Sequence, residues 1–282
     1  MRSRIQLLVL VPLLLAFSLT LPSQVTAQQK TLTLEMYMDL ESASNPQLSP
    51  DGDEIIYTRG GVDRVNDRRY SQIWIMNTDG SRKRYLTDGS SPVWSPDGTR
   101  IAYAAQGEPQ GSQIFVRWMD AEGATSQVTR VERGPGSLRW SPDGTQIAFT
   151  MAVEDAEPWS VSLPDRPRGA QWTDGPKIVN RLSYRRDRQG FVDTSHSHLF
   201  VVPAVGGTPR QLTDGEWNHS GPRWSPDGSE IFFSSLREEE ADWMWRESEV
   251  YAVNVETGAF RQLTTRRGPD SGPVPSPDGE LV

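Results

Sequence analysis

The tetrapeptide Ser-Pro-Asp-Gly occurs five times in this chain of 282 residues, beginning at Ser49, Ser95, Ser141, Ser225 and Ser276. Its residues match the preferences of a type I turn, with Ser first, Pro with its preset φ second, Asp third and Gly fourth. A corner repeated this often predicts a fold built from copies of one unit, because such a unit buries its faces only by stacking on its neighbours.

The residues after each turn alternate in the manner of a β-strand. In four copies, large apolar residues stand four and six positions after the Asp: Ile55 and Tyr57, Ile101 and Tyr103, Ile147 and Phe149, Ile231 and Phe233. A period of two gives each strand one apolar face. Three positions before the Asp stands Trp94, Trp140 or Trp224, and later in the units two further apolar segments predict a third and a fourth strand.

The spacing of the turns indicates the architecture. The turn aspartates lie 46, 46, 84 and 51 residues apart, and 84 reads as a doubled period. A degenerate unit is therefore expected near Tyr184-Arg185-Arg186-Asp187, with Tyr184 at the Trp position and Phe191 at the Ile position. A period of about 40 to 50 residues is typical of a β-propeller with four-stranded blades. We predict an all-β propeller that is incomplete at the C-terminus, with five blades plus the first hairpin of a sixth.

Three segments depart from the repeat. The third unit lacks recognisable third and fourth strands and continues as a Pro-rich excursion from Glu154 to Trp172. The fifth unit carries the acidic segment Arg237 to Glu249. Loops of this kind form binding surfaces on propellers, and the alternative is a solvated acidic loop held by two Trp. The last unit stops at Val282, so the ring is expected to be cut short and its exposed strand edges to promote self-association.

The N-terminus has the pattern of a signal peptide over residues 1–27. Arg2 and Arg4 precede an apolar run from Ile5 to Leu21, and Val25-Thr26-Ala27 supplies small residues for cleavage. The alternative is an uncleaved membrane anchor. We expect removal of this segment, a lead-in over residues 28–45, a propeller over residues 46–282, and a periplasmic or extracellular location.

Composition excludes several classes of function. The formal net charge is −8, and because residues 1–27 hold two Arg and no Asp or Glu it becomes −10 after their removal. A chain this acidic, without a basic stripe, does not favour nucleic-acid binding. Cys is absent, which excludes disulfides, thiol catalysis and a lipoprotein anchor.

Motifs of catalysis are not found in the sequence. No Gly-X-Ser-X-Gly pentapeptide occurs, and the nearest segment, Gly134-Pro135-Gly136-Ser137, lies in a blade entry. Neither a phosphate-binding loop nor a dinucleotide fingerprint is present, so no cofactor is expected. His196 and His198 project to one face of a strand at a separation that can seat a metal, with His219 the third histidine, but surface or cavity-lining roles are the favoured interpretation.

The repeat units resemble the WD40-like repeats of TolB-type propellers. The segments EMYMDLESASNPQLSPDG, from Glu35, and PRGAQWTDGPKIVNRLSYRRDRQGFVDTSHSHLFVVPAVGGTPRQLTDGEWNHSGPRWSPDG, from Pro167, more closely resemble the N-terminal propeller of prolyl-oligopeptidase-like (S9) serine peptidases. Within that family, the acylaminoacyl-peptidase and dipeptidyl-aminopeptidase branch is the most similar, and the resemblance covers nearly all of residues 31–282.

This resemblance implies a propeller that filters peptide substrates for a C-terminal α/β-hydrolase domain, which transfers the acyl group to Ser and then to water. The hydrolase part is absent from this sequence, so no catalytic residue is assigned and the chain is expected to be inactive alone. The segment Glu238 to Glu240 is a candidate amine-binding element, and no residue of the family is matched to it. The alternatives are a TolB-like propeller that binds protein partners, and a propeller lyase acting on uronates.

Overall fold

The computed structural model describes residues 31–120, 122–155, 165–173, 179, 181–192, 194–244 and 246–282. The expected signal segment, residues 1–27, lies outside the described residues, as does much of the Pro-rich excursion. The chain divides into two compact units, residues 1–38 and 39–282. In the first unit the structure describes the short helix α1 (Leu34–Met38), which follows Thr33, whose hydroxyl accepts the backbone N–H of Met36 at 3.2 Å.

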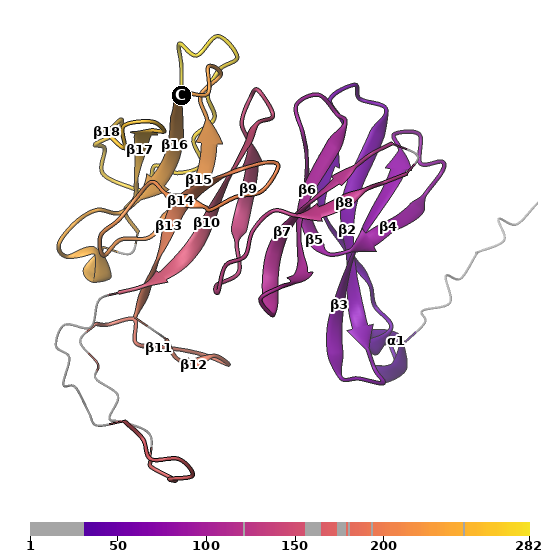
Figure 1. The fold of residues 1–282 in the computed structure, drawn as a ribbon, viewed down its shortest axis with the longest axis horizontal. Coiled ribbons are helices and arrows are strands. Elements are labelled where there is room, and N and C mark those ends of the chain that lie inside the picture. The colour runs from indigo at the N-terminus through magenta and orange to yellow at the C-terminus, as the bar shows by residue number, and fades with distance from the viewer. Residues whose placement is uncertain are drawn as a thin grey trace, which may run out of the picture. The chain divides into compact units, whose positions relative to one another are not determined.

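The second unit is built from four antiparallel four-stranded sheets, each a meander of neighbouring strands (Figure 1). Sheet 1 consists of β1 (Ser42–Leu48), β2 (Glu54–Asp63), β3 (Arg68–Asn77) and β4 (Arg84–Asp88). Sheet 2 consists of β5 (Ser90–Trp94), β6 (Arg100–Gly107), β7 (Gly111–Trp118) and β8 (Thr125–Gln127). Sheet 3 consists of β9 (Gly136–Trp140), β10 (Gln146–Glu154), β13 (Ser195–Pro203) and β14 (Arg210–Gln211). Sheet 4 consists of β15 (His219–Trp224), β16 (Glu230–Ser235), β17 (Glu249–Asn254) and β18 (Phe260–Gln262).

All five Ser-Pro-Asp-Gly segments form the predicted turns. In each, the Gly backbone N–H donates to the Ser carbonyl at 2.9 Å. The Ser hydroxyl donates to the Asp carboxylate at 2.5 to 2.6 Å and accepts a backbone N–H five residues further on at 2.9 Å. The hydrogen bond from Ser is the largest cause that lowers the pKa of each turn Asp. The motif therefore fixes the corner between the first and second strands of each sheet and recurs after sheet 4.

The tryptophans that precede the turns join one sheet to the next. The indole N–H of Trp94 donates to the Gln47 carbonyl in sheet 1 at 3.3 Å. Trp140 likewise donates to Val93 in sheet 2 at 3.2 Å, and Trp224 to Arg139 in sheet 3 at 3.1 Å. The same contact thus recurs at each boundary between neighbouring sheets, which explains why the Trp recurs in the sequence.

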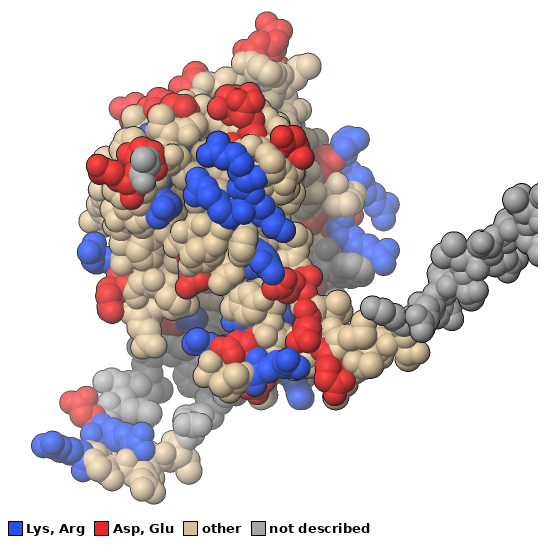
Figure 2. All heavy atoms as spheres, turned by 90° about the vertical axis from the view of Figure 1, so that its right-hand side faces the viewer, with Lys and Arg blue, Asp and Glu red and all other residues tan. Residues whose placement is uncertain are grey.

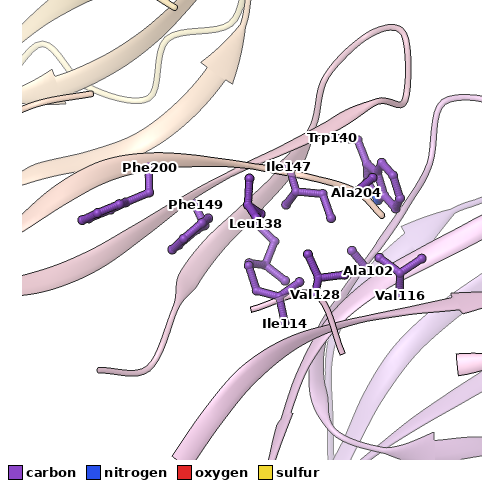
Figure 3. Close-up of a cluster of buried hydrophobic side chains, with 11 residues drawn as sticks. Ala102, Ile114, Val116, Val128, Leu138, Trp140, Ile147, Phe149, Phe200 and Ala204 are labelled. Carbon is purple, nitrogen blue, oxygen red and sulfur yellow. The ribbon is translucent and has the colours of Figure 1, made fainter. Parts of the chain in front are cut away.

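Apolar side chains fill each boundary between neighbouring sheets. Figure 3 shows the cluster between sheets 2 and 3, in which Ile114 and Val128 face Leu138, Ile147 and Phe149. The equivalent cluster between sheets 1 and 2 contains the buried residues Ile56, Ile73, Ile75, Leu86, Ile101 and Tyr103. Between sheets 3 and 4 the cluster consists of Ala148, Leu199, Val201, Leu212, Trp224, Ile231, Phe233, Tyr251, Val253 and Val255. The core is thus divided among three equivalent interfaces.

The predicted number of blades is wrong for the part of the chain that the structure describes. The segment predicted as a degenerate fourth unit is a two-stranded hairpin, β11 (Arg185–Arg186) with β12 (Gly190–Phe191). Tyr184 and Phe191 pack on each other at a ring distance of 6.1 Å, and both are substantially exposed. They therefore do not occupy the buried Trp and Ile positions of a blade.

The 84-residue interval is one sheet with a long insertion between its second and third strands. β10 pairs directly with β13 over nine residue pairs, from Gln146 opposite Pro203 to Glu154 opposite Ser195. The third and fourth strands predicted for the degenerate unit, β13 and β14, complete sheet 3. The described residues thus form four blades followed by one further turn at Ser276. Sheet 1 also begins at Ser42, inside the segment predicted as a lead-in.

The outer surface carries charges of both signs. Figure 2 shows the face at the right-hand side of Figure 1, where a group of Lys and Arg side chains is flanked by Asp and Glu. Within the residues that the structure covers, no helix has both the length and the apolar character to cross a bilayer.

Candidate functional site

Two adjoining pockets of about 510 and 480 Å³ lie at the boundary of sheets 3 and 4. They are lined by the segment after β10, the start of β13, residues 181–192, and the loop between β16 and β17, which contains the 3-10 helix η1 (Ala241–Trp243). Six residues line both pockets: Arg181, His196, Glu216, Trp217, Ala241 and Asp242. Residues remote in sequence therefore meet in one recessed surface.

The long β10–β13 pairing positions the residues at the floor of this surface. Val153 lies opposite His196, and beyond the last pair the backbone N–H of Asp155 donates to the Thr194 carbonyl at 2.9 Å. This register brings the Asp155 carboxylate to the His196 ring, and His196 Nδ1 lies 2.5 Å from Asp155 Oδ1.

His196 links a carboxylate to a guanidinium. Its Nε2 lies 2.9 Å from Arg181 Nη2, and since a guanidinium only donates, Nε2 must accept. Nδ1 then carries the proton and donates it to Asp155, so the hydrogen bonds assign the neutral Nδ1–H tautomer. The ring is buried and holds the negative Asp155 and the positive Arg181 on opposite sides.

A second histidine–arginine pair lies beneath the loop between β16 and β17. Buried His219 donates from Nδ1 to the Ser197 carbonyl at 3.1 Å and accepts at Nε2 from Arg237, 3.0 Å away. Burial lowers the pKa of His219 to about 4. The Arg237 guanidinium lies 4.6 Å from the Trp217 ring centroid and 4.5 Å from that of Phe260, at cation–π distance from both. Arg237 therefore fixes the start of the loop.

Carboxylates dominate the pocket of about 510 Å³, which we call the acidic pocket. Glu238, Glu239 and Glu240 of the loop line it, together with Asp155 and the shared Glu216 and Asp242. The Trp217 indole donates to the Glu238 carbonyl at 3.3 Å, and Asp242 accepts the Leu182 backbone N–H at 3.0 Å. These contacts hold the loop over the pocket, where the Trp243 side chain, 70% exposed, forms part of the wall.

The pocket of about 480 Å³, which we call the arginine pocket, has a different lining. Arg133 and Arg186 line it in addition to the shared Arg181, together with polar side chains such as Asn218. Arg133 forms an ion pair with Glu154 at the end of β10. The arginine pocket thus has three guanidinium groups, one of them paired with Glu154, beside the two shared carboxylates, whereas the acidic pocket has one guanidinium group and six carboxylates.

The structure places the predicted residues as follows. His196 lines both pockets, whereas His198 is buried behind it, with its ring centroid 5.2 Å from that of His219. Burial, followed by the neighbouring His196, lowers the pKa of His198. The described part of the chain contains no group of three His, Cys, Asp or Glu that could hold a metal ion. The Gly134–Ser137 segment leads into β9, as expected of a blade entry.

The acidic segment lines the acidic pocket, and its described part is not anchored by a Trp of its own. Trp243 is too exposed to anchor it, and Trp245 lies outside the described residues. The anchors are Arg237 and Trp217, which sequence reasoning did not single out. Asp155 and Arg181 were missed as well, because they meet His196 only through the β10–β13 pairing and the insertion.

Comparison with known proteins agrees with the fold. Residues 169–280 match the family described as the dipeptidyl peptidase IV (DPP IV) N-terminal region. The uncharacterized peptidase YuxL of Bacillus subtilis is 31% identical over 212 residues, covering 73% of this chain and 31% of the relative. Dipeptidyl-peptidase 5 of Porphyromonas endodontalis is 28% identical over 283 residues, covering 93% of this chain and 39% of the relative.

Solved structures give the same assignment of fold. The acylaminoacyl peptidase of Pyrococcus horikoshii superposes with a TM-score of 0.60 at 15% identity, over 81% of this chain and 33% of that protein. A puromycin-hydrolyzing peptidase of Mycobacterium tuberculosis superposes with a TM-score of 0.51 at 15% identity, over 81% of this chain and 32% of that protein. The chain therefore spans about a third of the length of these four proteins.

Proposed function

This chain is related to the N-terminal propeller domains of S9 serine peptidases, and from that premise we propose that it admits and holds peptide substrates for such a peptidase. Hydrolysis itself, in this proposal, is carried out by residues outside the 282 of this chain. The expected export rests on residues 1–27, and an intact Met1 on the mature protein recovered from cells would argue against it.

The observation that carries the proposal is the acidic pocket. Six carboxylates line it and Arg181 is the cationic residue among its lining residues. The amino end of a peptide is a cation at neutral pH, since an α-amino group has a pKa of about 7.7 to 8.0. Hydrogen bonds from an ammonium group to carboxylates are charge-assisted and stronger than neutral ones. The pocket is therefore suited to the free amino end of a peptide.

The loop supplies the groups that are best placed for this role. Glu239 and Glu240 follow directly after the segment anchored by Arg237 and Trp217, so their backbone is held at the pocket. The backbone N–H of Trp243 donates to the Glu240 carbonyl at 2.9 Å. This hydrogen bond spans the short helix η1 and holds the backbone of Glu240 at its start. An ammonium group in the pocket would therefore meet carboxylates that are carried on an anchored backbone.

Binding of Ala-Ala-amide and of its N-acetylated form to the full chain, measured by isothermal titration calorimetry, tests the proposal. The free amine is expected to bind about tenfold more tightly, because a charge-assisted hydrogen bond contributes about 1.5–3 kcal/mol. The double variant Glu239→Gln/Glu240→Gln should lose this preference. Glu256→Gln, in the β17–β18 turn, should keep it. Equal binding of both peptides by the unmodified chain would refute amino-end recognition.

A further inference from the structure

The two pockets at the boundary of sheets 3 and 4 differ in the charged residues that line them. The residues that line only the acidic pocket include four carboxylates: Asp155, Glu238, Glu239 and Glu240. The residues that line only the arginine pocket include two guanidinium groups, Arg133 and Arg186, and no carboxylate. Since the pockets share six lining residues, among them Glu216 and Asp242, they form one surface with an acidic end and an end at which the arginines gather, one of which, Arg133, also pairs with Glu154.

Asp155, which lines only the acidic pocket, is joined through the shared His196 to the shared Arg181. Asp155 and Arg181 bind opposite nitrogens of the neutral His196 ring, so one imidazole and two hydrogen bonds separate the negative from the positive charge. The two charges do not neutralise each other by direct contact. A dipeptide matches this scale, because consecutive Cα atoms lie about 3.8 Å apart and its charged ends are roughly two such steps apart.

Three elements bring the arginines together. Arg133 precedes β9, Arg181 follows the Pro-rich excursion, and Arg186 lies on the hairpin strand β11. The planar guanidinium group binds carboxylates through parallel hydrogen bonds, which makes it well suited to carboxylate recognition. Ser183 and Asn218, which also line the arginine pocket, provide further hydrogen-bonding groups.

We propose that the arginine pocket binds a carboxylate of the same peptide whose ammonium group lies in the acidic pocket. The site then selects short peptides that carry a carboxylate within about two residues of the amino end. This inference rests on the proposed function for the ammonium half, whereas the carboxylate half is independent of it. The carboxylate is either the α-carboxylate of a dipeptide or the side chain of an Asp or Glu residue.

Calorimetry with four peptides separates the two halves. The full chain is titrated with Ala-Ala, Ala-Ala-amide, Ala-Asp-amide and N-acetyl-Ala-Ala. Ala-Ala is expected to bind about tenfold more tightly than Ala-Ala-amide, which lacks the carboxylate. If Ala-Asp-amide binds as tightly as Ala-Ala, the pocket accepts a side-chain carboxylate, and if it binds as weakly as Ala-Ala-amide, the pocket selects the α-carboxylate.

Neighbouring residues of β11 supply a matched pair of variants. Successive side chains on a strand point to opposite faces, and Arg186 lines the arginine pocket whereas Arg185 does not. Arg186→Gln should therefore reduce the preference for Ala-Ala over Ala-Ala-amide to about twofold or less, and Arg185→Gln should leave it unchanged.

The possible failures are distinct. Equal affinity of the unmodified chain for Ala-Ala and Ala-Ala-amide overturns the carboxylate site but leaves amino-end recognition intact. Equal affinity for Ala-Ala and N-acetyl-Ala-Ala refutes the proposed function instead. Equal loss of preference in Arg185→Gln and Arg186→Gln would also overturn the carboxylate site, because it would show a general effect of charge.

Discussion

Replacement of Phe149 by alanine is expected to lower the free energy of unfolding by about 3–5 kcal/mol. Phe149 is fully buried between sheets 2 and 3 and lies opposite Phe200 in the β10–β13 pair, with the two rings stacked at 5.5 Å. The substitution removes this contact and leaves a cavity in a tightly packed interface (Figure 3). Urea denaturation followed by Trp fluorescence measures the change.

Phe191→Ala provides the control for this experiment. The spacing of the turns predicts that Phe191 takes the place of the buried strand Ile in a degenerate unit. In the structure it lies on the β11–β12 hairpin and is 49% exposed. Its substitution is expected to change stability by no more than about 1 kcal/mol. Similar losses for Phe149→Ala and Phe191→Ala would mean that the hairpin belongs to a buried sheet, contrary to the structure.

The second large effect is a loss of stability on acidification that depends on His219. An unfolded histidine titrates near pH 6.5, whereas burial lowers the pKa of His219 to about 4 in the folded chain. Between these values the unfolded state binds the proton and the folded state does not. Stability is therefore retained above pH 6.5 and falls as the pH decreases towards 4, by about 3 kcal/mol in total.

The charged groups around His219 also affect its protonation. Arg237 faces Nε2 and His198 lies alongside, and both disfavour a second positive charge, while Asp214 acts in the opposite direction. Protonation would also remove the acceptor that Arg237 uses, which would loosen the start of the acidic loop.

Denaturation between pH 7.5 and 4.5 in the unmodified chain and in His219→Gln measures the effect. The variant should be less stable at pH 7.5 but should show a shallower decline, with the remainder arising in part from His198, whose pKa is also lowered. The turn aspartates do not obscure the window, because their lowered pKa values cost stability only below about pH 4. Equal slopes for the two proteins would contradict the burial of a neutral His219.

Much of the fold could be predicted from the sequence because its signals are local. The Ser-Pro-Asp-Gly turns, the apolar alternation after them and the preceding Trp all lie within about ten residues of one another in the sequence, and the structure bears them out. The blade count was wrong because a spacing of 84 residues does not distinguish two short units from one unit with a long insertion. The choice depends on the partner of β10, which is a long-range pairing.

The candidate site was harder to predict for the same reason. The three histidines could be singled out by residue type, but their partners could not. Asp155 and Arg181 lie 41 and 15 positions from His196, and Arg237 lies 18 positions from His219. One signal was available: the acidic segment begins with an Arg two residues after the end of a strand. Which of its residues face a pocket could be read only from the packing of sheets 3 and 4.

The pairing of β10 with β13 is the central claim, because it sets the number of blades and creates the site. The chain lacks Cys, so the double variant Glu154→Cys/Ser195→Cys reports on it without interference. Directly opposite residues of antiparallel strands have Cα atoms about 4.5–5.5 Å apart, within the range of a disulfide. We predict that mild oxidation forms an intramolecular disulfide in the folded protein in high yield, detected by mass spectrometry after alkylation. Free thiols at both positions in the folded, oxidised protein would contradict the account.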